Sequence, residues 1–158
     1  MAVKPLEYER ITMSEKDILI VEDATVIAEH IKMLVENQGY EVPAISATAE
    51  DAIEKVQEID PALVLMDIQL IGEMDGIEAT REINRRYNGN IPVVYITAYG
   101  DQATLKRAKE SGARALFTKP VKKNALNWIL NWVFDPQNNP PKPPGSLQAW
   151  FFEDEKTV

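Results

Sequence analysis

Short apolar runs alternate with amphipathic segments through the middle of the chain. Five runs are apolar enough to be buried strands, and they lie at residues 17–21, 41–46, 62–66, 91–96 and 114–118. Between them, apolar residues recur at the spacing of a helix, as in these stripes: Ile27, Ile31, Leu34 and Val35; Ala49, Ala52, Ile53 and Val56; Leu126, Ile129, Leu130 and Val133. Such alternation predicts a doubly wound α/β domain, a (βα)5 unit in three layers with helices on both faces of a parallel sheet.

Turn and capping residues agree with these boundaries. Gly39 and Gly112 stand where helices should end, and Thr48 is a favourable N-cap. The segment Asp75-Gly76-Ile77-Glu78 resembles a capping box with Asp as the cap. The fourth helix, near residues 101–110, offers little apolar surface beyond Ala103, Leu105 and Ala108, so we expect it to move more easily than the others.

Three regions differ in composition. Residues 1–16 are polar and irregular, which favours a flexible leader over a docking segment. Residues 17–134 carry the strand and helix pattern and form the predicted domain. Residues 135–158 begin with a proline-rich run, which is typical of an extended linker, and end in an aromatic and then acidic tail.

Composition narrows the possible partners. The chain has 158 residues, no cysteine and a formal net charge of −8, which argues against direct nucleic-acid binding. No apolar stretch approaches the roughly 20 residues of a membrane span, and the polar start is unlike a signal peptide. We therefore expect a cytoplasmic protein without membrane contact.

Charged residues follow three of the predicted strands. Glu22 and Asp23 close the first apolar run, Asp67 closes the third, and Lys119 follows the fifth. Ligands bind at the carboxyl ends of strands in open α/β sheets, so these groups are expected to gather at one edge. Three carboxylates placed together need a compensating cation, and Mg²⁺ prefers such oxygen ligands.

These residues resemble a known family. Residues 17–133 look like a response-regulator receiver domain of two-component signalling, with the flavodoxin-like strand order 2-1-3-4-5 that this family has. The resemblance rests on five separated motifs: Glu22-Asp23, Asp67, Met74-Asp75-Gly76, Thr97-Ala98 and Lys119-Pro120. Each is weak alone, because a single acid at a strand end is usually only a helix cap. Their joint occurrence after successive strands carries the assignment.

The resemblance implies a role for each acid. Asp67 would be the phosphoacceptor, receiving a phosphoryl group from a sensor histidine kinase or phosphotransfer protein. Asp23 and Asp67 would bind Mg²⁺ directly, together with the backbone carbonyl of Gln69. Glu22 would act on the metal mostly through water.

The remaining motif residues would stabilise the phosphoryl group. Lys119 would pair with Asp67 at rest and with a phosphoryl oxygen afterwards. Thr97 would supply a hydroxyl and Ala98 a backbone N–H. Tyr99 occupies a position at which family members modulate the lifetime of the phosphorylated state, although a surface tyrosine without a role is equally compatible with the sequence.

One position departs from the family pattern. Leu116 stands three residues before the lysine, where receiver domains commonly carry a switching Tyr or Phe. Phe117 should point to the opposite face of the strand, so it does not replace that aromatic residue. The usual aromatic switch is therefore not expected here.

Two tryptophans, Trp128 and Trp132, lie off the core stripe of the last helix. In receiver domains this helix, the fourth helix and the fifth strand, including Leu116, form a common dimerisation and output face. The tryptophans would then belong to a homodimer or effector surface. The alternative, which we slightly favour, is that the aromatic tail at 150–152 folds back and covers them.

Several functional alternatives remain open. The chain could be a receiver-like interaction module that is never phosphorylated, or the receiver part of a larger regulator or hybrid kinase. A Mg²⁺-dependent phosphohydrolase would need a general acid–base two residues after its nucleophile, and Gln69 cannot serve as one. The lone His30 has no partner that suggests catalysis. We therefore expect no enzyme activity beyond the protein's own phosphorylation and dephosphorylation.

Overall fold

The computed structural model describes residues 16–135, 137 and 148–152. Within these residues, six strands and five helices follow one another in this order: β1 (Ile18–Val21), α2 (Thr25–Glu36), β2 (Ile45–Ser46), α3 (Ala49–Ile59), β3 (Leu63–Met66), α4 (Gly76–Tyr87), β4 (Val93–Thr97), α5 (Gln102–Glu110), β5 (Ala115–Thr118), α6 (Lys123–Phe134) and β6 (Ala149–Phe151). All but the last residue of the leader predicted for residues 1–16, and most of the predicted linker, lie outside the described residues. No helix in the described residues is long and apolar enough to cross a membrane.

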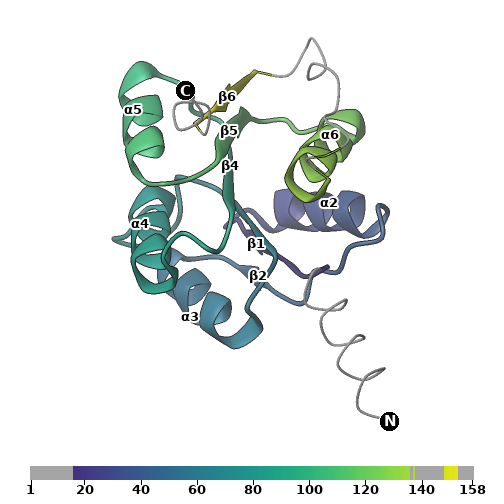
Figure 1. Cartoon of the computed structure of the whole chain (residues 1–158), viewed down its shortest axis with the longest axis horizontal. Coiled ribbons are helices and arrows are strands. Elements are labelled where there is room, and N and C mark those ends of the chain that lie inside the picture. Colours follow the sequence, from purple (N-terminus) through teal and green to yellow (C-terminus); the bar gives the residue numbers. More distant parts are fainter. Residues whose placement is uncertain (1–15, 136, 138–147, 153–158) are drawn as a thin grey trace.

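The strands form one sheet in the order β2-β1-β3-β4-β5-β6. The first five are parallel, which confirms the predicted doubly wound fold and its 2-1-3-4-5 order. The sixth strand was not predicted; it pairs antiparallel with the outer edge of β5. Figure 1 shows α2 and α6 on one face of the sheet and α3, α4 and α5 on the other.

Two apolar cores lie on either side of the sheet, because alternate residues of each strand point to opposite faces. In β1, Ile18 and Ile20 join the core beneath α2 and α6, whereas Leu19 and Val21 join the core beneath α3 and α4. The central strands are buried on both faces, which explains their uninterrupted apolar sequences.

The predicted caps are present. The Thr48 hydroxyl accepts from the Asp51 amide, and Asp75 and Glu78 form a reciprocal capping box at the start of α4. Gly39 and Gly112 follow α2 and α5 with φ of 91° and 90°, a region that favours glycine.

Three expectations need correction. The second strand is only Ile45–Ser46, shorter than the predicted 41–46, because Glu41 forms an isolated parallel bridge with Asp17 and the pairing is interrupted between that bridge and Ile45. Ile27 is exposed rather than part of the core stripe, since it lies beside a cavity at the sheet edge. In α5, Ala103 is exposed and only Ala108 is buried. The weak anchoring expected of this helix is thus more pronounced than its sequence suggested.

The predicted fold-back of the aromatic tail onto the tryptophans is present for Phe151, whereas Trp150 and Phe152 pack against the core on the opposite face of the sheet. Phe151 lies on the exposed side of α6, with ring centroids 5.5 Å from Trp128 and 4.9 Å from Trp132. The two tryptophans are also stacked on each other, with centroids 6.0 Å apart. An aromatic cluster at the β5 edge is therefore closed by the chain's own tail.

Candidate functional site

The carboxyl ends of four parallel strands converge at one edge of the sheet. β1 is followed by Glu22 and Asp23 and β3 by Asp67, while β4 ends at Thr97 and β5 is followed by Lys119. The pairing of β1 with β3 places Val21 opposite Met66, so the acids that follow the two strands are side by side. The fold thus brings the separated charged residues into one site.

Lys119 joins two of these acids. Its ammonium group donates to Oδ2 of Asp67 at 2.8 Å and to Oε1 of Glu22. Glu22 and Asp67 are only 3% and 6% exposed, so both carboxylates depend on this single cation for direct charge compensation within the described contacts. The other oxygen of Asp67, Oδ1, accepts from the Ile68 amide at 2.7 Å.

Charge and burial set the protonation of this cluster. Burial by itself lowers the pKa of the Lys119 ammonium, but its hydrogen bonds to Asp67 and Glu22 and their charges outweigh burial and leave that pKa above its ordinary value. Burial raises the pKa of Asp23, and hydrogen bonding to Glu22 and its negative charge raise it further. The charge of Lys119 acts in the opposite direction on Asp23 but does not outweigh these causes.

The carboxylates are close enough to share a cation. One oxygen from each of Glu22, Asp23 and Asp67 lies within 4.8 Å of the others. Two unit charges about 4 Å apart repel by roughly 4 kcal/mol at an effective dielectric constant near 20. A divalent cation with hard-oxygen preferences, such as Mg²⁺, fits this set of donors and would relieve the repulsion.

A cavity of about 590 Å³ opens above the acids. It is lined by Gln69, Ala98 and Tyr99, as well as by Glu22, Asp23, Asp67 and Lys119. Thr97 is fully buried and is not among the residues that line this cavity, and its Oγ1 is 3.5 Å from the Tyr99 amide, at the limit of a hydrogen bond. Tyr99 is 45% exposed, so a reactant can approach beside it.

The close approach of α4 shapes the floor of the site. A Cβ on Gly76 would lie 2.0 Å from the backbone carbonyl oxygen of Asp67, so only glycine fits there. The Gly76 amide donates to the Ile68 carbonyl at 2.8 Å, which joins the start of α4 to the residue after Asp67. This glycine was recognised in the sequence only as part of a motif, and its packing role required the tertiary structure.

The structure does not bring every singled-out residue to the site. Leu116 is buried in the core beneath α3 and α4, and Phe117 faces the opposite core, as strand alternation predicted. Trp128 and Trp132 lie with the aromatic cluster on α6 and are not among the residues lining the cavity. None of these four side chains lines the cavity that holds the acids.

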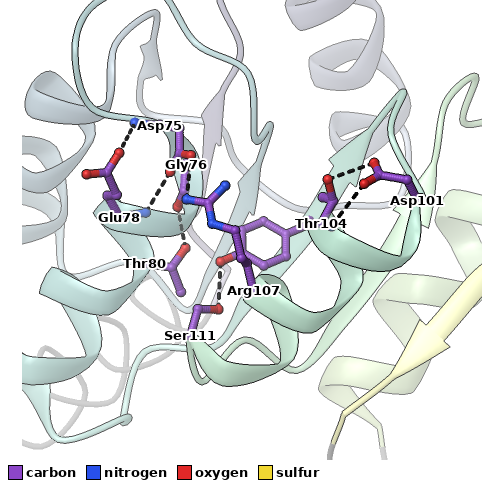
Figure 2. Close-up of polar contacts among 9 residues, drawn as sticks. Asp75, Gly76, Glu78, Thr80, Asp101, Thr104, Arg107 and Ser111 are labelled. Carbon is purple, nitrogen blue, oxygen red and sulfur yellow. Dashed lines mark hydrogen bonds and ion pairs between the residues drawn. The ribbon is translucent and has the colours of Figure 1, made fainter.

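Sequence reasoning missed a polar connection between the site and α5. Figure 2 shows Arg107 reaching from α5 to Asp75 at the start of α4, with Nη2 2.8 Å from Oδ2. Nearby, the Tyr95 hydroxyl lies 2.7 Å from Oγ of Ser111, which in turn donates to the Ala108 carbonyl. No local pattern marks these contacts, because the paired residues lie 32 and 16 positions apart.

Comparison with known proteins agrees with this geometry. The response regulator receiver domain model matches residues 18–131. The chemotaxis protein CheY of Thermotoga maritima is 34% identical over 118 residues, covering 75% of this chain and 97% of that protein, and CheY of Bacillus subtilis is 36% identical over 118 residues, covering 72% and 97%. The crystal structure of a CheY-like receiver domain protein from Methanospirillum hungatei has 32% identity and a TM-score of 0.71, covering 77% of this chain and 95% of that one. The chain therefore belongs to the response regulator receiver domain family of two-component signalling.

Proposed function

We propose that this chain is a Mg²⁺-dependent phosphoaspartate switch with Asp67 as its phosphoacceptor. The observation that carries the proposal is that the Asp67 carboxylate lines an open cavity, accepts from Lys119 and is clustered with two further acids. The lysine and the Ile68 amide both donate to Asp67, and the lysine and the Ala24 amide both donate to Glu22, so two of the three acids are held in fixed positions.

The reaction is a transfer between two nucleophiles. A carboxylate oxygen of Asp67 forms a bond to phosphorus while the bond from phosphorus to the donor's histidine nitrogen breaks, and the imidazole leaves as a neutral base after protonation. The donor is a phosphohistidine of a sensor histidine kinase or a phosphotransfer protein. The product is an acyl phosphate on Asp67, and water later returns it to the free carboxylate.

Both reactants are anionic, so neutralisation of charge is the main requirement. Glu22, Asp23 and Asp67, together with the backbone carbonyl of Gln69, would hold Mg²⁺, with Glu22 acting mostly through water. The bound cation supplies electrostatic stabilisation of the phosphoryl oxygens.

The chain's own residues complete the site. The Lys119 ammonium already lies within bonding distance of Asp67, so a small movement transfers its contact to a phosphoryl oxygen. The Thr97 hydroxyl has only a long contact at rest, which leaves it available as a donor. The backbone amide of Ala98 would be a second donor, and Tyr99 at the cavity mouth would limit the access of water to the product.

Signal output would follow from this charge rearrangement. We place it at the face formed by α5, β5 and α6, because β4 and β5 lead directly from the site to these elements and α5 is weakly anchored. The protein would act in the cytoplasm as a regulated binding partner, possible homodimers included, without enzymatic turnover of other substrates and without direct nucleic-acid binding by this chain.

Intact mass spectrometry tests the proposal. The protein is incubated with Mg²⁺ and either acetyl phosphate or phosphoramidate, quenched rapidly, and compared with Asp67→Asn and with Asp51→Asn, an acid on α3 outside the cluster. We expect one phosphoryl adduct in the wild type and in Asp51→Asn, and none in Asp67→Asn or without Mg²⁺.

Two outcomes would contradict the assignment of Asp67 as the phosphoacceptor. An adduct that persists in Asp67→Asn would assign the phosphoacceptor elsewhere. If no adduct forms and beryllofluoride with Mg²⁺ also fails to bind, the chain is an interaction module with a receiver fold instead of a phosphorylated switch.

A further inference from the structure

The C-terminal segment of residues 148–152, called here the strap, lies along the outer edge of β5. In Figure 1, β6 is the yellow strand beside β5 at the edge of the sheet. Leu116 is opposite Trp150, and the pairing is extended by hydrogen bonds from the Thr118 amide to the Gln148 carbonyl at 3.1 Å and from the Phe152 amide to the Arg114 carbonyl at 3.0 Å. The strap thus occupies an edge that an open five-stranded sheet would leave available for pairing.

On one face of the sheet, the strap covers the aromatic cluster. The Phe151 ring meets Phe117 edge-on at 5.7 Å between centroids and also contacts Trp128 and Trp132. Removing the strap would expose these aromatic side chains beside an unpaired strand edge. Such a combination is typical of a surface that binds another protein chain.

On the other face, the strap touches the loop that follows Thr97. A Cβ on Gly100 would lie 2.9 Å from Cη2 and 3.2 Å from Cζ3 of Trp150, so the indole packs directly on this glycine. The same Cβ would lie 3.4 Å from Cγ2 of Thr118. Gly100, Trp150 and the end of β5 therefore form one tightly packed contact.

The strap contacts Gly100 and Thr118, and both lie close in sequence to residues that would bind the phosphoryl group. Gly100 is two residues after Ala98, which lines the cavity, and Thr118 directly precedes Lys119, the cation bonded to Asp67. Closely packed contacts tolerate little displacement. If Ala98 or Lys119 moves towards a phosphoryl group, the neighbouring Gly100 or Thr118 therefore loses part of its contact with the strap.

We propose that the strap is an autoinhibitory cover whose attachment to the β5 edge is weakened when Asp67 is phosphorylated. Trp150 carries the coupling by its contact with Gly100, and its position opposite Leu116 places an aromatic side chain on the face of β5 opposite to Phe117. The strap pairs through only three strand residues, so a modest loss of contacts is enough to shift its equilibrium. This inference rests on the proposed phosphoaspartate switch.

Amide hydrogen exchange by NMR on the full chain measures strap opening. The amides of Thr118 and Phe152 report on the strap, and the Val64 amide, which donates to the Pro92 carbonyl at 2.9 Å, reports on the central sheet. We expect beryllofluoride with Mg²⁺ to accelerate exchange at Thr118 and Phe152 by about tenfold, within the usual range of coupling between two sites, and to leave Val64 unchanged.

Coupling must also act in reverse, because linkage is reciprocal. Trp150→Ala is expected to open the strap without beryllofluoride and to increase the affinity for beryllofluoride, measured by titration calorimetry. Gly100→Ala inserts a methyl group against the indole while retaining Trp150. It should also increase both strap opening and the affinity for beryllofluoride. Lys123→Met, an exposed substitution on α6, serves as the control.

The outcomes separate the two proposals. If beryllofluoride binds but exchange at Thr118 and Phe152 does not change, the strap is a static part of the fold and the inference is overturned. Unchanged beryllofluoride affinity in both Trp150→Ala and Gly100→Ala would overturn it as well. Absence of beryllofluoride binding to the wild-type chain would instead refute the proposed switch, and with it the signal that this inference assigns to the strap.

Discussion

The guanidinium of Arg107 lies 2.8 Å from Oδ2 of Asp75, while Oδ1 of the same carboxylate accepts from the Glu78 amide at 2.8 Å. One side chain thus caps α4 and also holds α5. Asp75 lines the cavity above Asp67, so the ion pair connects the edge of the site to a helix that buries little besides Ala108. Figure 2 shows this contact beside the capping box.

Removing this connection should loosen α5 more than it destabilises the domain. We expect Arg107→Met to lower the free energy of unfolding by no more than about 1 kcal/mol, because both partners remain partly exposed. Amide exchange within α5, for example at Leu105, should accelerate severalfold. Lys106→Met, an exposed neighbour on the same helix, should leave exchange unchanged. Equal exchange rates in the two variants would show that the ion pair does not restrain α5.

Lys119 should be essential for stability in the absence of a metal ion. Lys119→Met leaves Glu22 and Asp67 buried without their cation, and we expect a loss of about 1–3 kcal/mol, below the roughly 3–5 kcal/mol of a fully enclosed pair because the cavity admits water. The double variant Lys119→Met/Asp67→Asn should recover part of this loss. Urea unfolding would measure both, and a double variant less stable than the single one would contradict the electrostatic explanation.

Mg²⁺ should stabilise the folded chain through the acid cluster. At a Mg²⁺ concentration ten times its Kd, the expected gain is about 1.4 kcal/mol, measured as a shift in the thermal midpoint. Asp23→Asn should abolish this gain, and it should also stabilise the metal-free protein slightly because it removes one of three crowded charges. Glu36→Gln, at the far end of α2, should retain the full response to Mg²⁺. A normal metal response in Asp23→Asn would exclude it as a ligand.

Gly76 should not tolerate a side chain. The methyl group of Gly76→Ala would overlap the Asp67 carbonyl at 2.0 Å, so α4 or the segment after Asp67 must move. Overpacking of this kind typically costs about 1–3 kcal/mol, and we also expect slower phosphorylation of Asp67. By contrast, Gly39→Ala has open space and only backbone strain, so it should leave the phosphorylation rate unaltered. Equal phosphorylation rates in the two variants would contradict this account.

The buried Tyr95 should lower the free energy of unfolding as the pH rises above 10. Burial raises the pKa of the Tyr95 hydroxyl to about 12, although its hydrogen bonds to Ser111 and Thr80 act in the opposite direction. Because the folded-state pKa exceeds the unfolded value near 10, the native state keeps a proton that the unfolded chain loses. The contribution of Tyr95 to the free energy of unfolding is fully present below pH 10. About 2 kcal/mol of it is lost between pH 10 and about 12.

The matched variant isolates this effect. Tyr95→Phe should cost about 1 kcal/mol at pH 8 through the lost hydrogen bond to Ser111, and the difference from wild type should shrink above pH 10. Urea midpoints at pH 8 and pH 11 would measure this change. A difference that stays constant across the two pH values would indicate that Tyr95 ionises normally.

The sequence by itself determined the parallel sheet, its helices and the place where charge would gather. Alternating apolar runs report which faces of each strand are buried, because burial on both faces requires consecutive apolar residues. The residue after each run then lies at the same sheet edge, which is why Asp67 and Lys119, 52 residues apart, could be expected at one edge, whereas their direct pairing was implied by the family resemblance. Thr48 and Asp75 were recognised as caps because capping depends only on neighbouring residues.

Only the tertiary structure decided the contacts between elements that share no local pattern. Nothing in the short segment Ala149–Phe151 distinguishes a strand from an aromatic tail, and its pairing depends on the free edge of β5. The sequence does not indicate which acid pairs with Arg107, and the structure shows that it is Asp75. Ile27 fits the helical stripe of the sequence, but in the structure it lines a cavity. Local periodicity encodes which residues turn inward, whereas the partner that each residue meets depends on how distant elements pack.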